Sequence, residues 1–279
     1  MPVSSLREEF ATLVRDGARC GLGRGALEIA RIAYPDLQPD RYLAEFDNLA
    51  EAARPGTGGR MPPEDVALAI GEHLFRACGF HGNTEDYHDP RNSFLNDVLE
   101  RRTGIPISLS VVFIEVSRRL GLPVEGVGFP GHFLVRVAGH RGPLLLDPFF
   151  GGRPVDDAEL VERLRALHGG RELRELPREA LRTASTPDIL ARMLRNLLRV
   201  YLSRDDPPHA LATVDLLLVL VPDSPDDLRT RGCLYEHLDC VPAAAADFRR
   251  FLDLVPHAPD ADEIRARLAR LLKASQTIH

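Results

Sequence analysis

The stretch that decides the fold is Gly104-Ile105-Pro106-Ile107-Ser108-Leu109-Ser110, which opens the most apolar helix that the sequence predicts. Pro106 suits the first helical position, because the N–H that proline lacks has no intrahelical partner there. Apolar side chains continue round most of the helix to about Leu120. A helix that is hydrophobic on most sides belongs in the interior of a domain. We therefore expect this helix to form the centre of the first domain.

A small antiparallel sheet is predicted directly after this helix. Three short apolar segments read as strands, and they are 124–129, 133–137 and 144–146. A hairpin centred on Gly139-His140 would place His132 opposite Asp147. The same register pairs Leu134 with Leu145, and directly opposed residues share a face. The pattern thus predicts a His–Asp pair on an otherwise aliphatic surface, an arrangement that orients and polarises an imidazole.

Composition is that of an ordinary globular protein. The 279 residues are 44% hydrophobic and 27% charged, with 35 basic against 41 acidic side chains and a formal charge of −6. No basic block stands apart from acidic neighbours, which disfavours nucleic acid as a partner. The apolar run 214–221 is too short to span a bilayer, so no membrane association is expected. Four scattered cysteines favour a reducing cytoplasm, with the thiols acting as small buried hydrophobes.

Helices are predicted in the sequence before and after the strands of the sheet. Residues 3–90 show helical spacing, and Asn92 or Ser93 could cap a helix that ends near Arg102. Asp156 or Asp157 could cap another helix, which would run through Leu167 and stop at Gly169-Gly170. The charged, proline-containing segment 171–187 is the expected inter-domain link.

The C-terminal part reads as a repeat. Pro222 and Pro256 are separated by the period of a tetratricopeptide unit, which gives copies at 191–224 and 225–258. The residues at the signature positions are Leu194, Leu197, Tyr201, Ala210, Val214, Leu217, Leu228, Gly232, Tyr235, Ala244, Phe248 and Phe251. A further helix at 263–273 would cover the exposed end. Two repeats are fewer than a free-standing solenoid needs, so we expect them to lean on the first domain.

Four motifs together resemble the core of the transglutaminase-like superfamily. They are Gly104-x-Pro106, Arg119-Leu120-Gly121-Leu122-Pro123, Gly131-His132-Phe133 and Leu146-Asp147-Pro148. In that superfamily a Gly-x-Cys begins the central helix, and a His and then an Asp follow on successive strands. With the repeats behind it, the chain resembles the bacterial SirB-type proteins, and a related domain occurs in a eukaryotic F-box protein. The resemblance implies a papain-type Cys-His-Asp arrangement for acyl transfer or amide hydrolysis.

The resemblance places the general base at His132 and its orienting carboxylate at Asp147, but it places the nucleophile at Pro106, which has none. Such a pair alone cannot carry out covalent acyl transfer. Ser110, about 40° from the face of Pro106 and one turn deeper, is one possible replacement. Two less well placed candidates are Ser108 and Cys78. We expect the serines to bond to backbone groups or to the buried imidazole instead.

A polar loop and the helix after it supply the remaining candidates. A metal site could use His81, His88 and either Asp86 or Asp89, but polar loops of this kind usually stay solvated. We therefore predict no metal and no cofactor. A polar cluster beside the cleft is expected either to bind a partner or to cap and salt-bridge the helices, and it consists of Arg91, Asn92, Asn96, Glu100 and Arg101.

These observations predict an α+β fold. Residues 1–180 would form a mostly helical transglutaminase-like domain with a small antiparallel sheet, and 187–279 an all-α tetratricopeptide repeat domain. The leading interpretation is an interaction or regulatory protein with a catalytically degenerate domain and a protein or peptide partner. The alternative is a hydrolase or acyltransferase in which His132, oriented by Asp147, activates water or Ser110. A third possibility is a scaffold in which this pair only stabilises the sheet.

Overall fold

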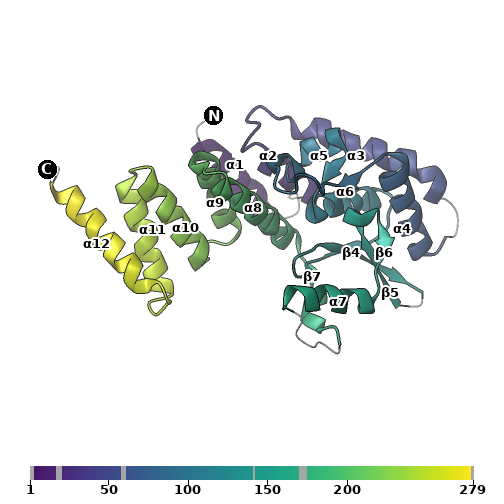
Figure 1. The fold of residues 1–279 in the computed structure, drawn as a ribbon. Coiled ribbons are helices and arrows are strands. Elements are labelled where there is room, and N and C mark those ends of the chain that lie inside the picture. Colours follow the sequence, from purple (N-terminus) through teal and green to yellow (C-terminus); the bar gives the residue numbers. More distant parts are fainter. Residues whose placement is uncertain (1–2, 17–20, 58–60, 141, 170–174, 278–279) are drawn as a thin grey trace. The chain divides into compact units, whose positions relative to one another are not determined.

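The chain forms two compact units, which are seen in the ribbon of a computed structural model (Figure 1). The structure describes residues 3–16, 21–57, 61–140, 142–169 and 175–277. The sheet unit spans Cys20–Met193, and the repeat unit combines Met1–Arg19 with Leu194–His279. Helix α8 (Thr186–Ser203) therefore contributes residues to both units.

Helix α1 (Val3–Arg15) groups differently from the predicted first domain of residues 1–180. It packs against α9 (Pro207–Leu220), and both helices belong to the repeat unit. Its apolar residues recur at helical spacing, and Phe10 among them is fully buried. The sequence pattern showed that α1 has an apolar face, but it could not show which helix covers that face.

The sheet unit is built from helices around one small sheet. Its other helices are α2 (Leu22–Ala30), α3 (Pro39–Ala53), α4 (Pro63–Gly71), α5 (Leu95–Arg101), α6 (Pro106–Arg119) and α7 (Asp157–Leu167). Its strands are β1 (His81–Gly82), β2 (Thr103–Gly104), β3 (Val124–Val127), β4 (Leu134–Gly139), β5 (Gly142–Asp147), β6 (Arg153–Pro154) and β7 (Thr183–Ala184). Short 3-10 turns are η1 (Arg54–Thr57), η3 (Pro90–Asn92), η4 (Pro148–Phe150) and η5 (Arg178–Leu181), and η2 (Glu72–Ala77) is a π-helical turn.

Helix α6 lies at the centre of the sheet unit, as the sequence predicts. Pro106 is its first residue, and the residues from Pro106 to Ser117 are all buried. The helix packs against α3, strand β3 and the η4 turn. At its start, the Ser108 hydroxyl accepts a hydrogen bond from the Ile105 N–H (3.0 Å) and donates one to the Asn92 carbonyl (2.6 Å). These bonds fix the beginning of α6 against the chain that precedes α5.

The five-stranded sheet has the order β6-β5-β4-β3-β7, and its adjacent strands are antiparallel. The predicted hairpin register is wrong by two residues. Leu145 pairs with Arg136, not with Leu134, because the last pair of the hairpin is Gly139 with Gly142. A shift of two residues keeps every side chain on its predicted face.

Helices cover both faces of this sheet. Figure 1 shows the sheet between α7 on one side and the group that contains α6 on the other. Buried residues on the α7 side form one cluster, whose members are Val127, Phe129, Leu134, Leu145, Val155, Leu160, Leu164 and Ala180. The predicted link at 171–187 is partly ordered into the sheet, since β7 pairs with β3 along its edge. Of that segment, residues 171–174 lie outside the described part.

Two predicted helix caps have different outcomes. The Asp156 side chain accepts a hydrogen bond from the Glu159 N–H (2.8 Å) at the start of α7, which confirms that cap. The cap predicted at Asn92 or Ser93 is wrong, because α5 begins after Phe94 without a side-chain cap. The capping carboxylate here is Asp89, which accepts a hydrogen bond from the Arg91 N–H and caps the η3 turn.

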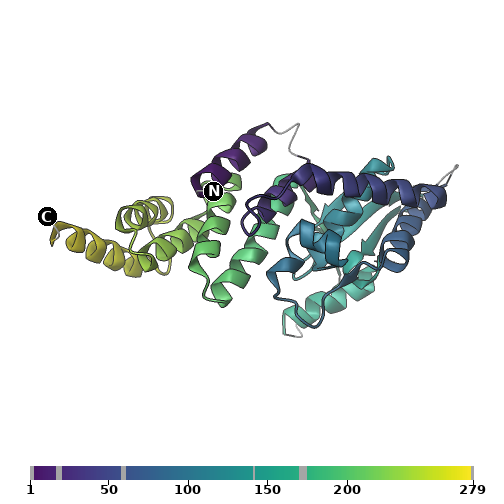
Figure 2. The same cartoon turned by 90° about the horizontal axis from the view of Figure 1, so that it is seen from above.

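The repeat unit consists of paired helices. After α8 and α9 come α10 (Pro225–His237), α11 (Val241–Leu254) and the final helix α12 (Ala261–Thr277). From α9 to α12 each helix packs on the next, and these helices run from green to yellow in Figure 2. Gly232 of α10 is required by its neighbour, since a Cβ atom there would lie 2.6 Å from the Phe248 ring of α11. The predicted α+β fold with terminal helical repeats is confirmed.

Candidate functional site

The predicted His–Asp pair is present. His132 lies in the turn before β4, and its Nε2 atom is 2.8 Å from Oδ1 of Asp147, the last residue of β5. Asp147 is fully buried, and 13% of the His132 side chain is exposed. An ionised carboxylate only accepts hydrogen bonds, so Nε2 carries the hydrogen of this bond. In the neutral imidazole, Nδ1 is then the nitrogen that can accept a proton.

Asp147 is held in its ionised form by several donors. Its Oδ1 also accepts hydrogen bonds from the N–H groups of Phe149 (3.2 Å) and Phe150 (3.4 Å). Arg163 of α7 forms an ion pair with the other oxygen, with Nη2 2.8 Å from Oδ2. Burial alone would raise the pKa of Asp147, but the contacts with His132 and Arg163 outweigh it and lower the pKa below 3.8. The site therefore holds a buried charge that can orient the imidazole.

Two phenylalanines cover the imidazole. The Phe150 ring stacks on His132 with centroids 6.0 Å apart and 19° between the planes. Phe149 approaches edge-on, also at 6.0 Å and at 89°. The η4 turn supplies both rings, and its first N–H groups bind the Asp147 side chain. One short turn thus fixes both partners of the pair.

The serines at the start of α6 bond to the backbone. The Ser110 hydroxyl donates to the Pro106 carbonyl at 2.8 Å, and Ser110 is fully buried. Ser108 is equally buried and donates to the Asn92 carbonyl. Among the described residues, no serine, threonine or cysteine forms a hydrogen bond with the His132 ring. These two hydroxyls therefore fix the first turns of α6.

The described cysteines lie outside the His132 site. The Sγ atom of Cys78 is 3.3 Å from Nε2 of His73, and burial raises the pKa of its thiol. Cys233 is half-buried, whereas Cys240 is exposed, so the prediction that all four thiols are buried is wrong for Cys240. Cys20 lies outside the described residues.

Comparison with known families identifies the fold around this pair. A family model for the transglutaminase-like superfamily matches residues 40–195, and one for the tetratricopeptide repeat matches residues 197–269. The first match covers more than half of the chain. The chain belongs to the transglutaminase-like superfamily. Both α6 and the His132–Asp147 pair lie inside the matched segment of this transglutaminase-like chain.

Two bacterial relatives of this transglutaminase-like protein align with most of the chain, and a eukaryotic relative aligns with a smaller part of it. A UPF0162 protein of Xylella fastidiosa is 43% identical over 88% of each chain. Protein SirB1 of Salmonella typhimurium is 27% identical over 91% of this chain and 93% of its own length. F-box only protein 21 of Mus musculus is 32% identical over 71% of this chain but only 32% of its own length. No solved structure gives a significant match.

Most of the predicted polar cluster is bound to the domain's own loop. Asn92 is fully buried, and its Nδ2 atom donates to the Asp86 carbonyl at 2.7 Å. Arg91 and Arg101 both pair with the Asp89 carboxylate, at 2.8 and 3.6 Å. Asn96 is also buried, and its Oδ1 atom has no hydrogen-bond partner among the described residues. These contacts give most of the cluster a structural use.

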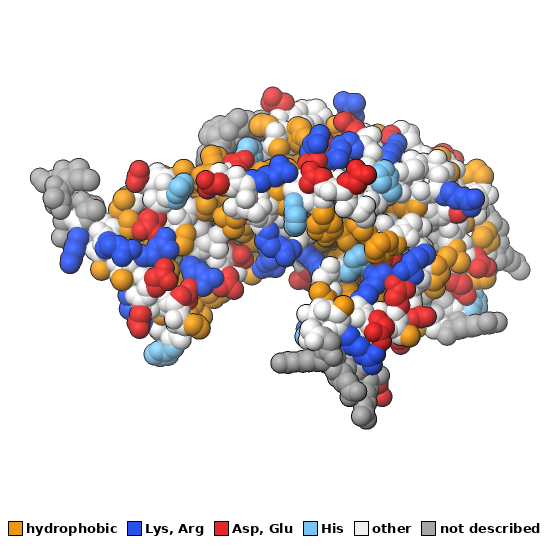
Figure 3. Space-filling view, in the orientation of Figure 1, with side chains coloured by type: hydrophobic (Ala, Val, Ile, Leu, Met, Phe, Trp, Pro, Cys, Tyr) orange, Lys and Arg blue, Asp and Glu red, His pale blue; other side chains and the backbone are white. Residues whose placement is uncertain are grey.

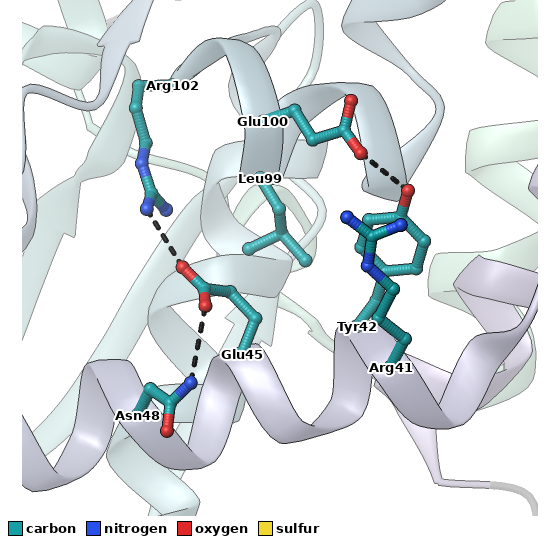
Figure 4. Close-up of a pocket in the computed structure, with 7 residues that line it drawn as sticks. All are labelled: Arg41, Tyr42, Glu45, Asn48, Leu99, Glu100 and Arg102. Atoms are coloured by element: carbon teal, nitrogen blue, oxygen red, sulfur yellow. Dashed lines mark hydrogen bonds and ion pairs between the residues drawn. The ribbon is translucent and has the colours of Figure 1, made fainter.

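Glu100 lies apart from the others, beside a pocket of about 380 Å³. The pocket is formed by α3, α5 and the residue after α5, and it is lined by Arg41, Tyr42, Glu45, Asn48, Leu99, Glu100 and Arg102 (Figure 4). Its two carboxylates already have partners, since Tyr42 donates to Glu100 at 2.6 Å and Arg102 pairs with Glu45 at 2.9 Å. Burial and the Glu100 contact raise the pKa of Tyr42 to about 12.

The residues weighed as metal ligands are not gathered into a site. In the described part of the chain, no group of three or more His, Cys, Asp or Glu side chains is placed to hold a metal ion. The His81 ring instead contacts the Gly79 carbonyl (3.0 Å) and the Thr103 hydroxyl (3.3 Å). The described helices also include none with the length and hydrophobicity that crossing a membrane requires.

Sequence reasoning missed Arg163 and Phe150. Arg163 lies on α7, beyond the hairpin, and pairs with Glu159 one turn earlier (2.6 Å) as well as with Asp147. That spacing reads as an ordinary helix salt bridge, so nothing in the sequence pointed to the site. Phe150 lies two residues after the Leu146-Asp147-Pro148 motif and has no periodic pattern. Its stacking on His132 follows from the η4 turn, which the sequence analysis did not predict.

Proposed function

We propose that this protein binds a peptide segment of another protein at the surface around His132 and carries out no covalent chemistry there. The observation that supports this most directly is Pro106, which stands where the family resemblance expects a nucleophilic thiol. The nearby serine hydroxyls are bonded to backbone carbonyls. The His132–Asp147 pair therefore has no side-chain nucleophile to activate, and its role is that of a fixed recognition surface.

Exposed apolar side chains around the imidazole support a peptide partner. We call these three residues the apolar rim, and they are Tyr87 (42% exposed), Phe150 (50%) and Leu167 (56%). Tyr87 contacts the Phe149 ring at 6.2 Å, and Leu167 lies against Gly131, the residue before His132. On the sheet unit, Figure 3 shows hydrophobic side chains at the surface among charged ones. Apolar groups gathered at one place on a surface mark an interaction site.

The repeats favour the same class of partner. Tetratricopeptide helices commonly bind extended or helical segments of other proteins, and this chain matches that family over residues 197–269. The relatives keep this combination along most of their length. A protein partner is therefore a better proposal than a small molecule. We propose further that the complex with this partner has a regulatory role.

The first experiment restores the missing thiol. Pro106→Cys should place a thiol at the start of α6, where the helix dipole lowers its pKa, and a thiol in the nucleophile's position of the superfamily would also pair with the His132 imidazole. We expect this variant to react with iodoacetamide at residue 106, and Pro106→Cys/His132→Ala to react more slowly. The unaltered protein should release no more nitrophenol from p-nitrophenyl acetate than its His132→Ala variant. Ester hydrolysis that disappears in His132→Ala would overturn the proposal.

The second experiment tests the apolar rim. Peptides selected from a phage-displayed library on the full chain should bind Phe150→Ala about tenfold more weakly, because one exposed aromatic ring contributes about 1.4 kcal/mol or more at the centre of an interface. Leu68→Ala is the matched control, since Leu68 is an exposed apolar residue of the same unit. Equal loss in both variants would place the peptide elsewhere.

One observation favours an alternative. Asp147 stays ionised while buried, which is what a general base at His132 would need to activate water. In this second candidate the protein is a hydrolase without a covalent intermediate. The p-nitrophenyl acetate comparison with His132→Ala separates the two proposals.

A further inference from the structure

The first two turns of α8 are fitted closely into the sheet unit. Each of three side chains there meets a glycine that leaves room for it. A Cβ atom on Gly25 would lie 2.6 Å from Leu190, and one on Gly126 would lie 3.0 Å from Ile189. Strand β3 thus carries α8 without an intervening side chain at Gly126.

Arg192 is the third of these side chains, and it reaches the turn that carries His132. Its Nη2 atom donates hydrogen bonds to the carbonyls of Phe129 (3.0 Å) and His132 (2.6 Å). The guanidinium also lies over the Phe133 ring, 5.4 Å from its centroid. Gly128 makes room for it, since a Cβ atom there would lie 3.3 Å from Nη1.

The two carbonyls that Arg192 binds are the ends of one tight turn. Within it, the His132 N–H donates to the Phe129 carbonyl at 3.0 Å, and Gly131 adopts a φ of +68°. Hydrogen bonds from a charged donor are about twice as strong as neutral ones, and a planar guanidinium fixes direction as well as distance. The turn is therefore held from one side by its own hydrogen bond and from the other by α8.

We propose that Arg192 is a positioning residue for His132, which holds the turn at 129–132 so that the imidazole reaches Asp147 and stacks on Phe150. This inference rests on the proposed function, because it assigns the control of that recognition surface to α8. The same helix continues past Met193 as the first helix of the repeats.

The test compares three variants of the full chain. Arg192→Ala should make the His132 amide exchange with solvent hydrogen about tenfold faster, since two charge-assisted hydrogen bonds to the turn are lost. Modification of the His132 ring by diethylpyrocarbonate should speed up similarly. Arg192→Lys keeps the charge but loses the planar fork, so we expect an intermediate value for both rates. Arg199→Ala is the control, because Arg199 is an exposed residue of the same helix and contacts Asn196 there.

Two results would overturn the proposal. One is a His132 exchange rate in Arg192→Ala equal to that in Arg199→Ala. The other is an equal rise in exchange throughout the sheet unit, which would make Arg192 a general stabilising residue. Neither result depends on the partner or on ester hydrolysis. Failure of the proposed function would appear in the p-nitrophenyl acetate comparison while leaving the exchange rates as predicted here.

Discussion

Each of the two units buries an aspartate beside an arginine, and the two aspartates are stabilised very differently. Asp147 in the sheet unit accepts hydrogen bonds from His132 and from two backbone N–H groups, and it forms an ion pair with Arg163. In the repeat unit, Asp215 and Asp247 share Arg231. Its Nη1 atom lies 2.8 Å from Asp215, and its Nε and Nη2 atoms lie 2.7 and 2.8 Å from the two oxygens of Asp247.

Burial acts in the same direction at both carboxylates, so the contrast between their pKa directions follows from the groups around each one. Burial would raise the pKa of both aspartates. Asp147 has enough donors to lower its pKa below the ordinary value, whereas burial raises the pKa of Asp215 because Arg231 offsets it only in part. The first arrangement suits a recognition site that orients a histidine. The second ties α9, α10 and α11 together and suits a structural network.

The largest effect should come from the repeat unit. Arg231→Met would leave two buried carboxylates without their shared cation, and breaking such a pair costs about 3–5 kcal/mol. We expect a loss of this size in the free energy of opening of the repeat unit, measured by amide hydrogen exchange of α9, α10 and α11 in increasing urea.

The control for this prediction is an exposed ion pair of the same unit. Arg250→Met removes the Arg250–Asp223 pair, in which both side chains are more than half exposed, and should cost about 0–1 kcal/mol. Equal effects of the two substitutions would mean that the buried network contributes nothing special.

In the sheet unit, Asp147→Asn should cost less. The amide keeps an oxygen that accepts from the Phe149 and Phe150 N–H groups, but it loses the charge that binds His132 and Arg163. Hydrogen bonds to charged groups contribute about 1.5–3 kcal/mol, and we expect a loss in that range in the urea unfolding of the full chain. Glu125→Gln, at an exposed pair with Arg136, should change stability by about 1 kcal/mol or less. If Asp147→Asn left the free energy of unfolding unchanged, Asp147 would not be ionised in the folded protein.

The two aspartates should also respond to pH with opposite signs. The folded pKa of Asp147 lies below 3.8, so its stabilising contribution is fully present above that pH and is lost as the pH falls through the folded pKa. The folded pKa of Asp215 lies above 3.8, so its charge destabilises the fold at neutral pH, and this penalty shrinks as the pH falls towards 3.8. Unfolding free energies of Asp147→Asn and Asp215→Asn, each compared with the unaltered protein from pH 7 down to pH 3, should show these trends. Parallel trends would remove the contrast between the sites.

The His132–Asp147 contact could be predicted from the sequence although the strand register could not. The hairpin centre predicted at Gly139-His140 is off by one residue, since the last pair of the hairpin is Gly139 with Gly142. Because side chains alternate along a strand, an error of two residues keeps Asp147 on its predicted face, but the contact itself depends on the turn before β4, where His132 lies. Helix α6 could also be predicted, because Pro106 suits the first position of a helix and the apolar run after it is typical of a buried one.

The contacts that fix this pair could not be predicted. Arg163 and Arg192 come from helices that begin well after the hairpin, and each reads as a solvated helix residue in the sequence. The α1 helix is a parallel case, because its apolar face gave no sign that α9 would cover it. Periodicity predicts which face of a helix is buried, but not which partner buries it.

The smallest effect should come from Ser110→Ala, which tests whether the His132–Asp147 site has a serine nucleophile. The Ser110 hydroxyl bonds back to the Pro106 carbonyl of its own helix, an arrangement that adds little to helix stability. Alanine has the better helix propensity, so we expect a change of about 1 kcal/mol or less in urea unfolding. Peptide binding should be unaffected, because the buried hydroxyl does not contact His132. A Ser110→Ala protein that lost activity on p-nitrophenyl acetate, with its fold intact, would return Ser110 to the role of nucleophile and Asp147 to that of a catalytic residue.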